Sequence, residues 1–178
     1  MSSFYFGSLD TPIGLLRVCV SRRGVCDVSF HVQDEASYRE RMSKKVPMIV
    51  DDRACVSAAL HELDAYFEGT LTRFTVPVDL ASVSRFTQRV LSVVSCILYG
   101  RLVSYAYIAN QIGSPSASRA VGAALGRNPV PIIVPCHRVI TSDGRLGGFT
   151  GGLDVKRTLL RCEGNDFSAT APARILQR

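Results

Sequence analysis

Residues 128–140, "NPVPIIVPCHRVI", are the stretch that most restricts what this 178-residue chain can fold into. Proline removes a backbone donor and clashes with the preceding helical turn, so three prolines in one short segment exclude a helix. We therefore expect the chain to be extended and stiff here. The segment leads to Cys136 and His137, which set a strong nucleophile directly beside the commonest general base.

The overall composition favours a folded, water-soluble protein. Apolar residues make up 47% of the chain, enough for an ordinary core. No apolar run approaches the ~18 residues that span a bilayer. The N-terminal residues lack the basic start and long apolar stretch of a signal peptide. We expect an intracellular protein, cytoplasmic in a prokaryote or nuclear in a eukaryote.

The cysteine pattern predicts free thiols. None of the six cysteines forms a C-x-x-C pair, which argues against a paired zinc site or a thioredoxin-type site. Most of them sit in apolar strings, such as Cys19 in "LLRVCVS" and Cys96 in "VVSCILY", where a buried free thiol is the usual state. A disulfide framework is not expected in a chain of this length without a secretory signal.

Positive charge is concentrated in the second half of the chain. Residues 82–178 hold twelve Arg and Lys against four Asp and Glu, a balance of +8, whereas residues 1–81 hold nine against eleven, a balance of −2. A basic half beside a near-neutral one suggests a polyanionic partner. The alternative is a basic surface that serves only solubility.

The first half predicts a small domain of mixed sheet and helix. Residues 14–21 and 24–32 are rich in branched side chains, and the "RRG" turn between them indicates a hairpin. Residues 51–69 have helical periodicity, with Asp51 or Asp52 as the cap and Gly69 at the end. An extended link follows, and we place the domain boundary near residue 81.

The second half begins with helices that glycines separate. The first runs from a Ser84 cap to Gly100, with apolar residues at helical spacing. The second ends at Gly113, and a turn at residues 114–116 leads to a short helix rich in Ala and Gly. Two short helices joined in this way fit a helix-turn-helix, although a plain helical hairpin has the same pattern. Arg119 is the one long cation on the second of these helices.

The neighbours of Cys136 suggest nucleophilic catalysis. A thiol attacks as its thiolate, so a base or a positive charge must assist it, and His137 and Arg138 are candidates. The His137 ring can reach Cys136 only across a turn or through a water, because adjacent side chains on a strand point to opposite faces. A base also needs a group that fixes its tautomer. Glu163, at the end of the last predicted helix, is the candidate, and a solvated helix-end carboxylate is the alternative.

Longer stretches carry a family resemblance. "IIVPCHRVI" resembles the Pro-Cys-His-Arg-Val signature of the O6-alkylguanine-DNA alkyltransferases, also called methylated-DNA–protein-cysteine methyltransferases. "GRLVSYAYIA", "SRAVGAALGRNPVPIIVPCHRVI", "GGFTGGLDVKRTLL" and "EG" follow the family's order and spacing, roughly over residues 84–164. The resemblance implies an α+β chain. A small N-terminal domain (1–81) precedes a winged helix-turn-helix-like DNA-binding domain that carries the active site (82–165), and a loosely ordered tail (166–178) follows.

The resemblance implies a single-turnover DNA repair reaction without a cofactor. The protein would bind duplex DNA as a monomer, flip an O6-alkylguanine out of the stack and transfer the alkyl group irreversibly to Cys136. His137 would act as base through a water, and Glu163 would orient it. Asn128 would hydrogen bond the turn around the nucleophile. Tyr105 would press on the target's phosphate and help to protonate the leaving purine.

The resemblance also implies DNA-contacting and pocket-lining positions. Arg119 would fill the gap left by the flipped base. Further expected DNA contacts are Ser116, Arg127 and Tyr105, and the expected pocket residues are Val139, Phe149 and Thr150.

The sequence departs from the family pattern in two respects, and three other functions are possible alternatives. Ala106 and Tyr107 replace residues that are common in the family, and the ligands of the zinc that some relatives bind are not at matching places, so we expect no metal. A non-catalytic binder of alkylated DNA would share the scaffold but lack the nucleophile. A winged-helix regulator would need no Cys-His pair, and a cysteine hydrolase usually has its Cys and His far apart in sequence.

Overall fold

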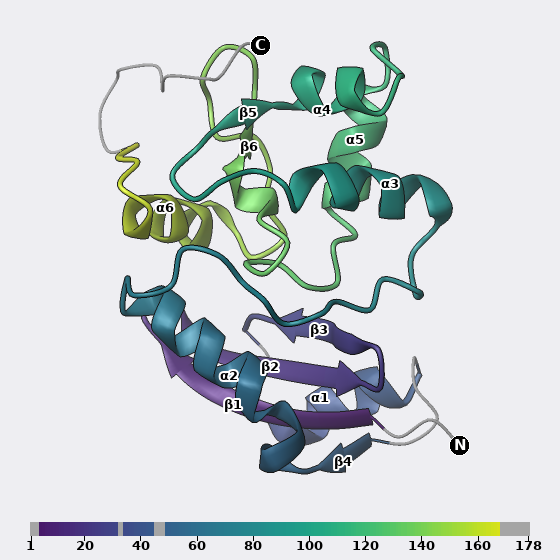
Figure 1. Ribbon diagram of the computed structural model, residues 1–178, viewed down its shortest axis with the longest axis vertical. Helices are drawn as coiled ribbons and strands as arrows, with labels where there is room; N and C mark the ends of the chain where they lie inside the picture. Colours follow the sequence, from purple (N-terminus) through teal and green to yellow (C-terminus); the bar gives the residue numbers. More distant parts are fainter. Residues whose placement is uncertain (1–3, 32–33, 45–48, 168–178) are drawn as a thin grey trace. The chain divides into compact units, whose positions relative to one another are not determined.

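The computed structural model of the chain describes residues 4–31, 34–44 and 49–167 (Figure 1). Residue contacts divide the chain into two compact units, residues 1–80 and 81–178. Among the described residues, none of the helices has the length and apolar character needed to cross a membrane.

A four-stranded sheet forms the centre of the first unit. The strands β1 (Phe4–Thr11), β2 (Gly14–Ser21), β3 (Gly24–Ser29) and β4 (Ile49–Asp51) lie in the order β3-β2-β1-β4. The pairs β1–β2 and β2–β3 are antiparallel, and β4 joins β1 in parallel. The predicted hairpin of residues 14–21 and 24–32 is thus confirmed as β2 and β3, although β3 ends at Ser29 and residue 32 lies outside the described residues. Strand β1 was not predicted, because its sequence "FYFGSLDT" lacks a regular alternation of apolar and polar residues.

Two helices cover the opposite faces of this sheet (Figure 1). Helix α2 (Arg53–Phe67) begins where expected, because the Asp52 carboxylate accepts the N–H groups of its first turn. It packs closely over Gly7, where an added Cβ would lie 2.6 Å from Val56. The side chain of Phe6 points to the other face and packs with Cys19 and with Tyr38 of helix α1 (Glu35–Ser43). Both faces of the sheet are therefore buried.

The second unit opens with helix α3 (Arg85–Val94), which is shorter than predicted. The Ser84 hydroxyl caps it as expected, but the helix ends six residues before Gly100. Tighter turns follow, closed by bonds such as Ile97 N–H to Val94 O. The turns bury Ile97 but leave Leu98 69% exposed. Cys96, which was expected to be buried, is exposed for the same reason.

A helix-turn-helix pair follows, as predicted. The hydroxyl of Ser104 caps helix α4 (Tyr105–Gln111), and Gly113 ends it with φ +69°. Helix α5 (Ser118–Leu125) packs against both α3 and α4. The buried contacts of α5 come from Val121 and its neighbours Ala124 and Leu125. Its short side chains allow this close packing.

The proline-rich segment after α5 is not helical, but it is also not extended. It forms consecutive turns, in which Ile132 has φ +73° and the Val134 N–H bonds to Val130 O. These turns end in the single 3₁₀ turn η1 (Cys136–Arg138). The expectation that Cys136 and His137 lie on an extended segment is therefore wrong.

A short parallel pair and a last helix complete the second unit. Strand β5 (Val103–Ser104) pairs with β6 (Val139–Ile140), which continues directly from η1. Helix α6 (Leu153–Cys162) ends at Glu163, which is its C-cap. Phe167 packs on the buried cluster formed by Leu102, Ile140, Leu146 and Leu160. Residues 168–178 of the expected tail lie outside the described residues.

Candidate active site

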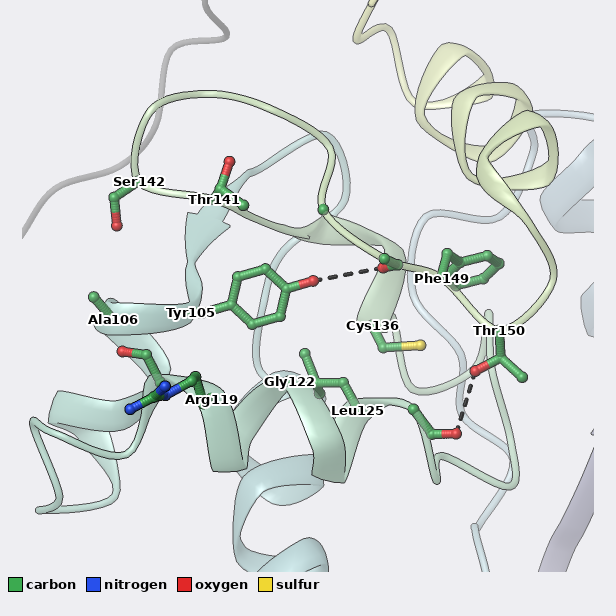
Figure 2. Close-up of a pocket in the computed structure, with 14 residues that line it drawn as sticks. Tyr105, Ala106, Arg119, Gly122, Leu125, Cys136, Thr141, Ser142, Phe149 and Thr150 are labelled. Carbon is green, nitrogen blue, oxygen red and sulfur yellow. Dashed lines mark hydrogen bonds between the residues drawn. The ribbon is translucent and has the colours of Figure 1, made fainter.

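Cys136 lies in the wall of a cavity of about 670 Å³ (Figure 2). The residue is 7% exposed, and its sulfur points towards Phe149 and Thr150. Helices α4 and α5 and the glycine-rich loop that follows β6 supply the other walls. Arg119 lies at the end of the cavity far from the sulfur. The cavity therefore joins the expected nucleophile to the helix-turn-helix.

The ring of Tyr105 lies across this cavity between α5 and the loop. Its hydroxyl donates to Gly148 O at 3.5 Å. At Gly147, which has φ +66°, an added Cβ would lie 2.8 Å from the Tyr105 hydroxyl oxygen. The glycines of this loop therefore let its backbone lie directly against the tyrosine.

Asn128 holds the turn that presents the nucleophile. Its Nδ2 donates to Val134 O at 2.9 Å and to the Cys136 sulfur at 3.1 Å. Its Oδ1 accepts the Val130 N–H at 3.1 Å. One side chain thus closes the turn at three points and provides a hydrogen bond that favours the thiolate.

His137 and Glu163 form a buried pair behind the nucleophile. The imidazole Nε2 lies 2.8 Å from Glu163 Oε1, and neither side chain is exposed to solvent. Burial opposes the ionisation of Glu163, but the hydrogen bonds and charges of His137 and Arg138 outweigh it and lower its pKa to about 2. The alternative of a solvated helix-end glutamate is therefore wrong.

The pair fixes the tautomer of the imidazole. An ionised carboxylate can only accept hydrogen bonds, so Nε2 of His137 carries its proton and Nδ1 has a free lone pair. Nδ1 is buried and has no hydrogen-bond partner among the described residues. Burial lowers the pKa of His137, which keeps the ring neutral at neutral pH. Such a ring can accept a proton at Nδ1.

The resting nucleophile is a thiol. Burial raises the pKa of Cys136, although the hydrogen bond from Asn128 and the charge of Lys156 act in the opposite direction. We expected the neighbours of Cys136 to produce a thiolate. In this geometry its proton leaves only when an acceptor such as His137 takes it.

Two cations of the site have roles that the sequence did not indicate. Arg138 was a candidate for activating the thiol, but it binds Glu163 through Nε at 2.9 Å and Ile97 O through Nη1 at 2.5 Å.

Lys156 was not predicted as a site residue at all. Its buried ammonium donates to the carbonyls of Val139, at 2.7 Å, and of Leu146, and burial lowers its pKa to about 8. The helical periodicity of α6 could have indicated this buried lysine, because Lys156 lies on the same face as the apolar residues Val155, Leu159 and Leu160.

The other expected site residues occupy different places. Phe149 and Thr150 line the cavity, and the Thr150 hydroxyl donates to Gly126 O at 3.3 Å. Val139 is completely buried and is not among the lining residues. Ser116 and Arg127 are exposed outside the cavity. Within residues 4–31, 34–44 and 49–167, no group of three or more His, Cys, Asp or Glu side chains could hold a metal ion.

Fold and site together define a cysteine-nucleophile protein built on a helix-turn-helix scaffold, and comparison with known proteins identifies its family. Residues 4–80 match the family described as "6-O-methylguanine DNA methyltransferase, ribonuclease-like domain". Residues 85–165 match the family described as "6-O-methylguanine DNA methyltransferase, DNA binding domain". The chain belongs to the 6-O-methylguanine DNA methyltransferase family.

Several relatives resemble the chain over most of its length. It is 41% identical to the methylated-DNA–protein-cysteine methyltransferase of Mycobacterium tuberculosis over 159 residues, covering 89% of this chain and 92% of the relative. It is 37% identical to the protein of that name from Methanosarcina acetivorans, covering 90% and 99%. The crystal structure of Mycobacterium tuberculosis OGT in complex with DNA has a TM-score of 0.76 at 39% identity, covering 90% of this chain and 92% of that one.

Proposed function

We propose that this protein repairs DNA by transferring the alkyl group of O6-alkylguanine, in duplex DNA, to the sulfur of Cys136. The observation that carries this proposal is the position of that sulfur in the cavity wall, hydrogen bonded to Asn128 and backed by the His137–Glu163 pair. The relatives that bear the name methylated-DNA–protein-cysteine methyltransferase support the same reaction.

The reaction is a single displacement at the alkyl carbon. The Cys136 thiol gives its proton, through a water, to Nδ1 of His137, and the imidazolium that forms is stabilised by the ionised Glu163. The sulfur then forms a bond to the alkyl carbon as the bond from that carbon to O6 of guanine breaks. The bonding electrons pass to the purine, which takes up a proton with the help of Tyr105 and leaves as guanine.

The product is a thioether, and no group of the site can cleave it. A neutral thioether is a poor substrate for displacement, and the hydroxyls that line the cavity with Cys136, such as those of Tyr105 and Thr150, are weak nucleophiles. Each molecule therefore reacts once. The reaction needs no cofactor, because the leaving purine carries away the electron pair.

Duplex DNA reaches the site through the helix-turn-helix. The exposed Arg119 and Arg127 and the +8 balance of residues 82–178 favour phosphate contacts. A target base has to leave the stack to enter a cavity that ends at Cys136. Arg119 stands at the outer end of that cavity and fills the vacated place in the duplex. We infer that one monomer is sufficient, because the residues assigned to the reaction all come from one chain.

Mass spectrometry after mixing with duplex DNA that contains O6-methylguanine tests this function. We expect the peptide that contains Cys136 to gain one methyl group, with the amount of product limited to one per protein molecule. Cys136→Ala should give no modified peptide and should still bind the DNA, because phosphate contacts elsewhere supply most of the affinity. Binding without any covalent change in the unmodified protein would favour the non-catalytic lesion binder.

A further inference from the structure

We propose that Tyr99 is a positioning residue for the transfer to Cys136, because its contacts fix Glu163 and Arg138 and thereby hold His137 in place. The inference rests on the proposed alkyl transfer. Tyr99 does not line the cavity, and it lies in the turns between α3 and β5.

The hydroxyl of Tyr99 anchors the end of α6. It donates to the carbonyl of Cys162 at 2.6 Å. The last carbonyls of a helix have no partner within the helix, so a side-chain donor at this place fixes the local backbone. Cys162 directly precedes Glu163, and the bond therefore holds the backbone from which the Glu163 side chain extends.

The next residue in the loop binds the carboxylate itself. The N–H of Gly100 donates to Glu163 Oε2 at 3.1 Å, and Asn165 Nδ2 donates to Gly100 O at 3.2 Å. Gly100 has φ +71°, and an added Cβ would lie 3.1 Å from the Glu163 carbonyl oxygen. Two further hydrogen bonds thus hold the loop against the end of α6 directly after Tyr99 and Cys162.

The ring of Tyr99 contacts the cation that pairs with this carboxylate. The guanidinium carbon of Arg138 lies 5.8 Å from the ring centroid, within the ~6 Å range of cation–π attraction. Arg138 donates to both oxygens of Glu163, from Nε to Oε2 at 2.9 Å and from Nη2 to Oε1 at 2.9 Å. Tyr99 therefore supports both members of the ion pair.

The consequence for the reaction concerns proton transfer. Among the residues that the structure describes, the charged or titratable groups that act on the His137 ring are Glu163, Arg138 and Lys156, and those that act on Cys136 are the ammonium of Lys156 and the neutral phenol of Tyr105. Of these, Glu163 alone makes His137 a better proton acceptor. If Tyr99 no longer fixes Glu163, the imidazole accepts the Cys136 proton less readily, and thiolate formation requires a higher pH.

The test is the pH dependence of the reaction with free O6-benzylguanine, which requires neither DNA binding nor base flipping. Tyr99→Phe keeps the ring and removes the hydroxyl, so we expect a roughly two- to tenfold slower reaction at neutral pH, as for one lost hydrogen bond. Tyr99→Ala should be slower still. For both variants, the midpoint of the rate profile should move to higher pH, and the rates should approach those of the unmodified protein above it.

The exposed neighbour Leu98 provides the matched control, since Leu98→Ala alters the same loop without touching the ion pair. Its rate profile should coincide with that of the unmodified protein. Equal slowing of the Tyr99 variants at every pH, or no slowing, would overturn the positioning role. Tyr99→Phe decides the question if Tyr99→Ala does not fold. Failure of the unmodified protein to react with O6-benzylguanine and methylated DNA would instead refute the proposed function.

Discussion

The His137–Glu163–Arg138 group shows how single residues in this site serve both stability and chemistry. Glu163 accepts hydrogen bonds from His137, Arg138 and the Gly100 N–H inside the protein. Removing one member of a buried ion pair leaves an uncompensated charge, which typically destabilises a protein by about 3–5 kcal/mol. The same contacts keep Glu163 ionised and fix the tautomer of His137, so the geometry that holds the fold together also prepares the proton acceptor.

The depressed pKa of Glu163 predicts a specific acid sensitivity. Its pKa falls from 4.5 to about 2 on folding, so the stabilisation is complete above 4.5 and is lost as the pH falls through about 2. That shift corresponds to roughly 3 kcal/mol, at ~1.4 kcal/mol per pKa unit. We expect Glu163→Gln to unfold at lower urea concentration than the unmodified protein at pH 7, with the difference shrinking towards pH 2.

Asp154 supplies the control for this measurement, because it is a fully exposed carboxylate on the same helix. Asp154→Asn should follow the unmodified protein at every pH. If the stability difference caused by Glu163→Gln is independent of pH, the carboxylate is not held ionised by its partners, and the assignment of the His137 tautomer loses its basis.

At the scale of elements, the sequence predicted those features that depend on neighbouring residues, such as helix caps and turns. The caps Asp52 and Ser84 set the starts of α2 and α3, and the helix-turn-helix followed from its glycines. The end of α3 was not predictable in this way, because Ile97 and Leu98 continue the apolar period after the helix has ended. The turns there are stabilised by distant partners, such as the bond from Arg138 to Ile97 O.

The site was predictable to the extent that its residues are close in sequence or belong to a recognisable motif. Cys136, His137 and Asn128 lie within one segment, and the structure places them around one turn. Lys156 and Tyr99 come from distant segments, and each donates a hydrogen bond to a backbone carbonyl. Every residue has a backbone carbonyl, so such contacts cannot be predicted from the types of the residues in a single sequence.

Helix α5 is expected to act in base flipping through Arg119. Extruding a base costs a few kcal/mol of stacking, part of which a guanidinium can return by stacking and hydrogen bonding in the vacated place. Arg119→Ala should therefore slow the repair of duplex DNA about tenfold, a loss of ~1.4 kcal/mol, and leave the reaction with free O6-benzylguanine nearly unchanged. The measurement is the second-order rate constant for each substrate.

Arg157 on α6 is a suitable comparison, because it is an exposed arginine outside the cavity. Arg157→Ala should change the two rates by the same small factor. If Arg119→Ala slows both substrates equally, the side chain supports the fold or the thiol chemistry, and the role in base flipping has to be abandoned.

At the scale of the whole molecule, the two units differ in net charge. Residues 82–178 carry a balance of +8 and include the helix-turn-helix and the cavity, whereas residues 1–81 carry −2. A surface that neutralises phosphates releases condensed counterions, and its affinity then falls with salt in proportion to the number of phosphates contacted. The second unit should therefore account for the salt dependence of DNA binding.

This assignment predicts how the salt dependence changes in two arginine variants. The logarithm of the affinity should fall steeply and linearly with the logarithm of salt between ~50 and ~200 mM. Arg127→Ala, which removes an exposed cation beside the cavity, should reduce the slope by about 0.9, the value for one phosphate contact. Arg22→Ala removes an exposed cation from the first unit and should leave the slope unchanged. Titrations of a fluorescent duplex at several salt concentrations measure all three slopes. A flat dependence in the unmodified protein, or equal changes in the two variants, would mean that the second unit does not bind DNA through its charge.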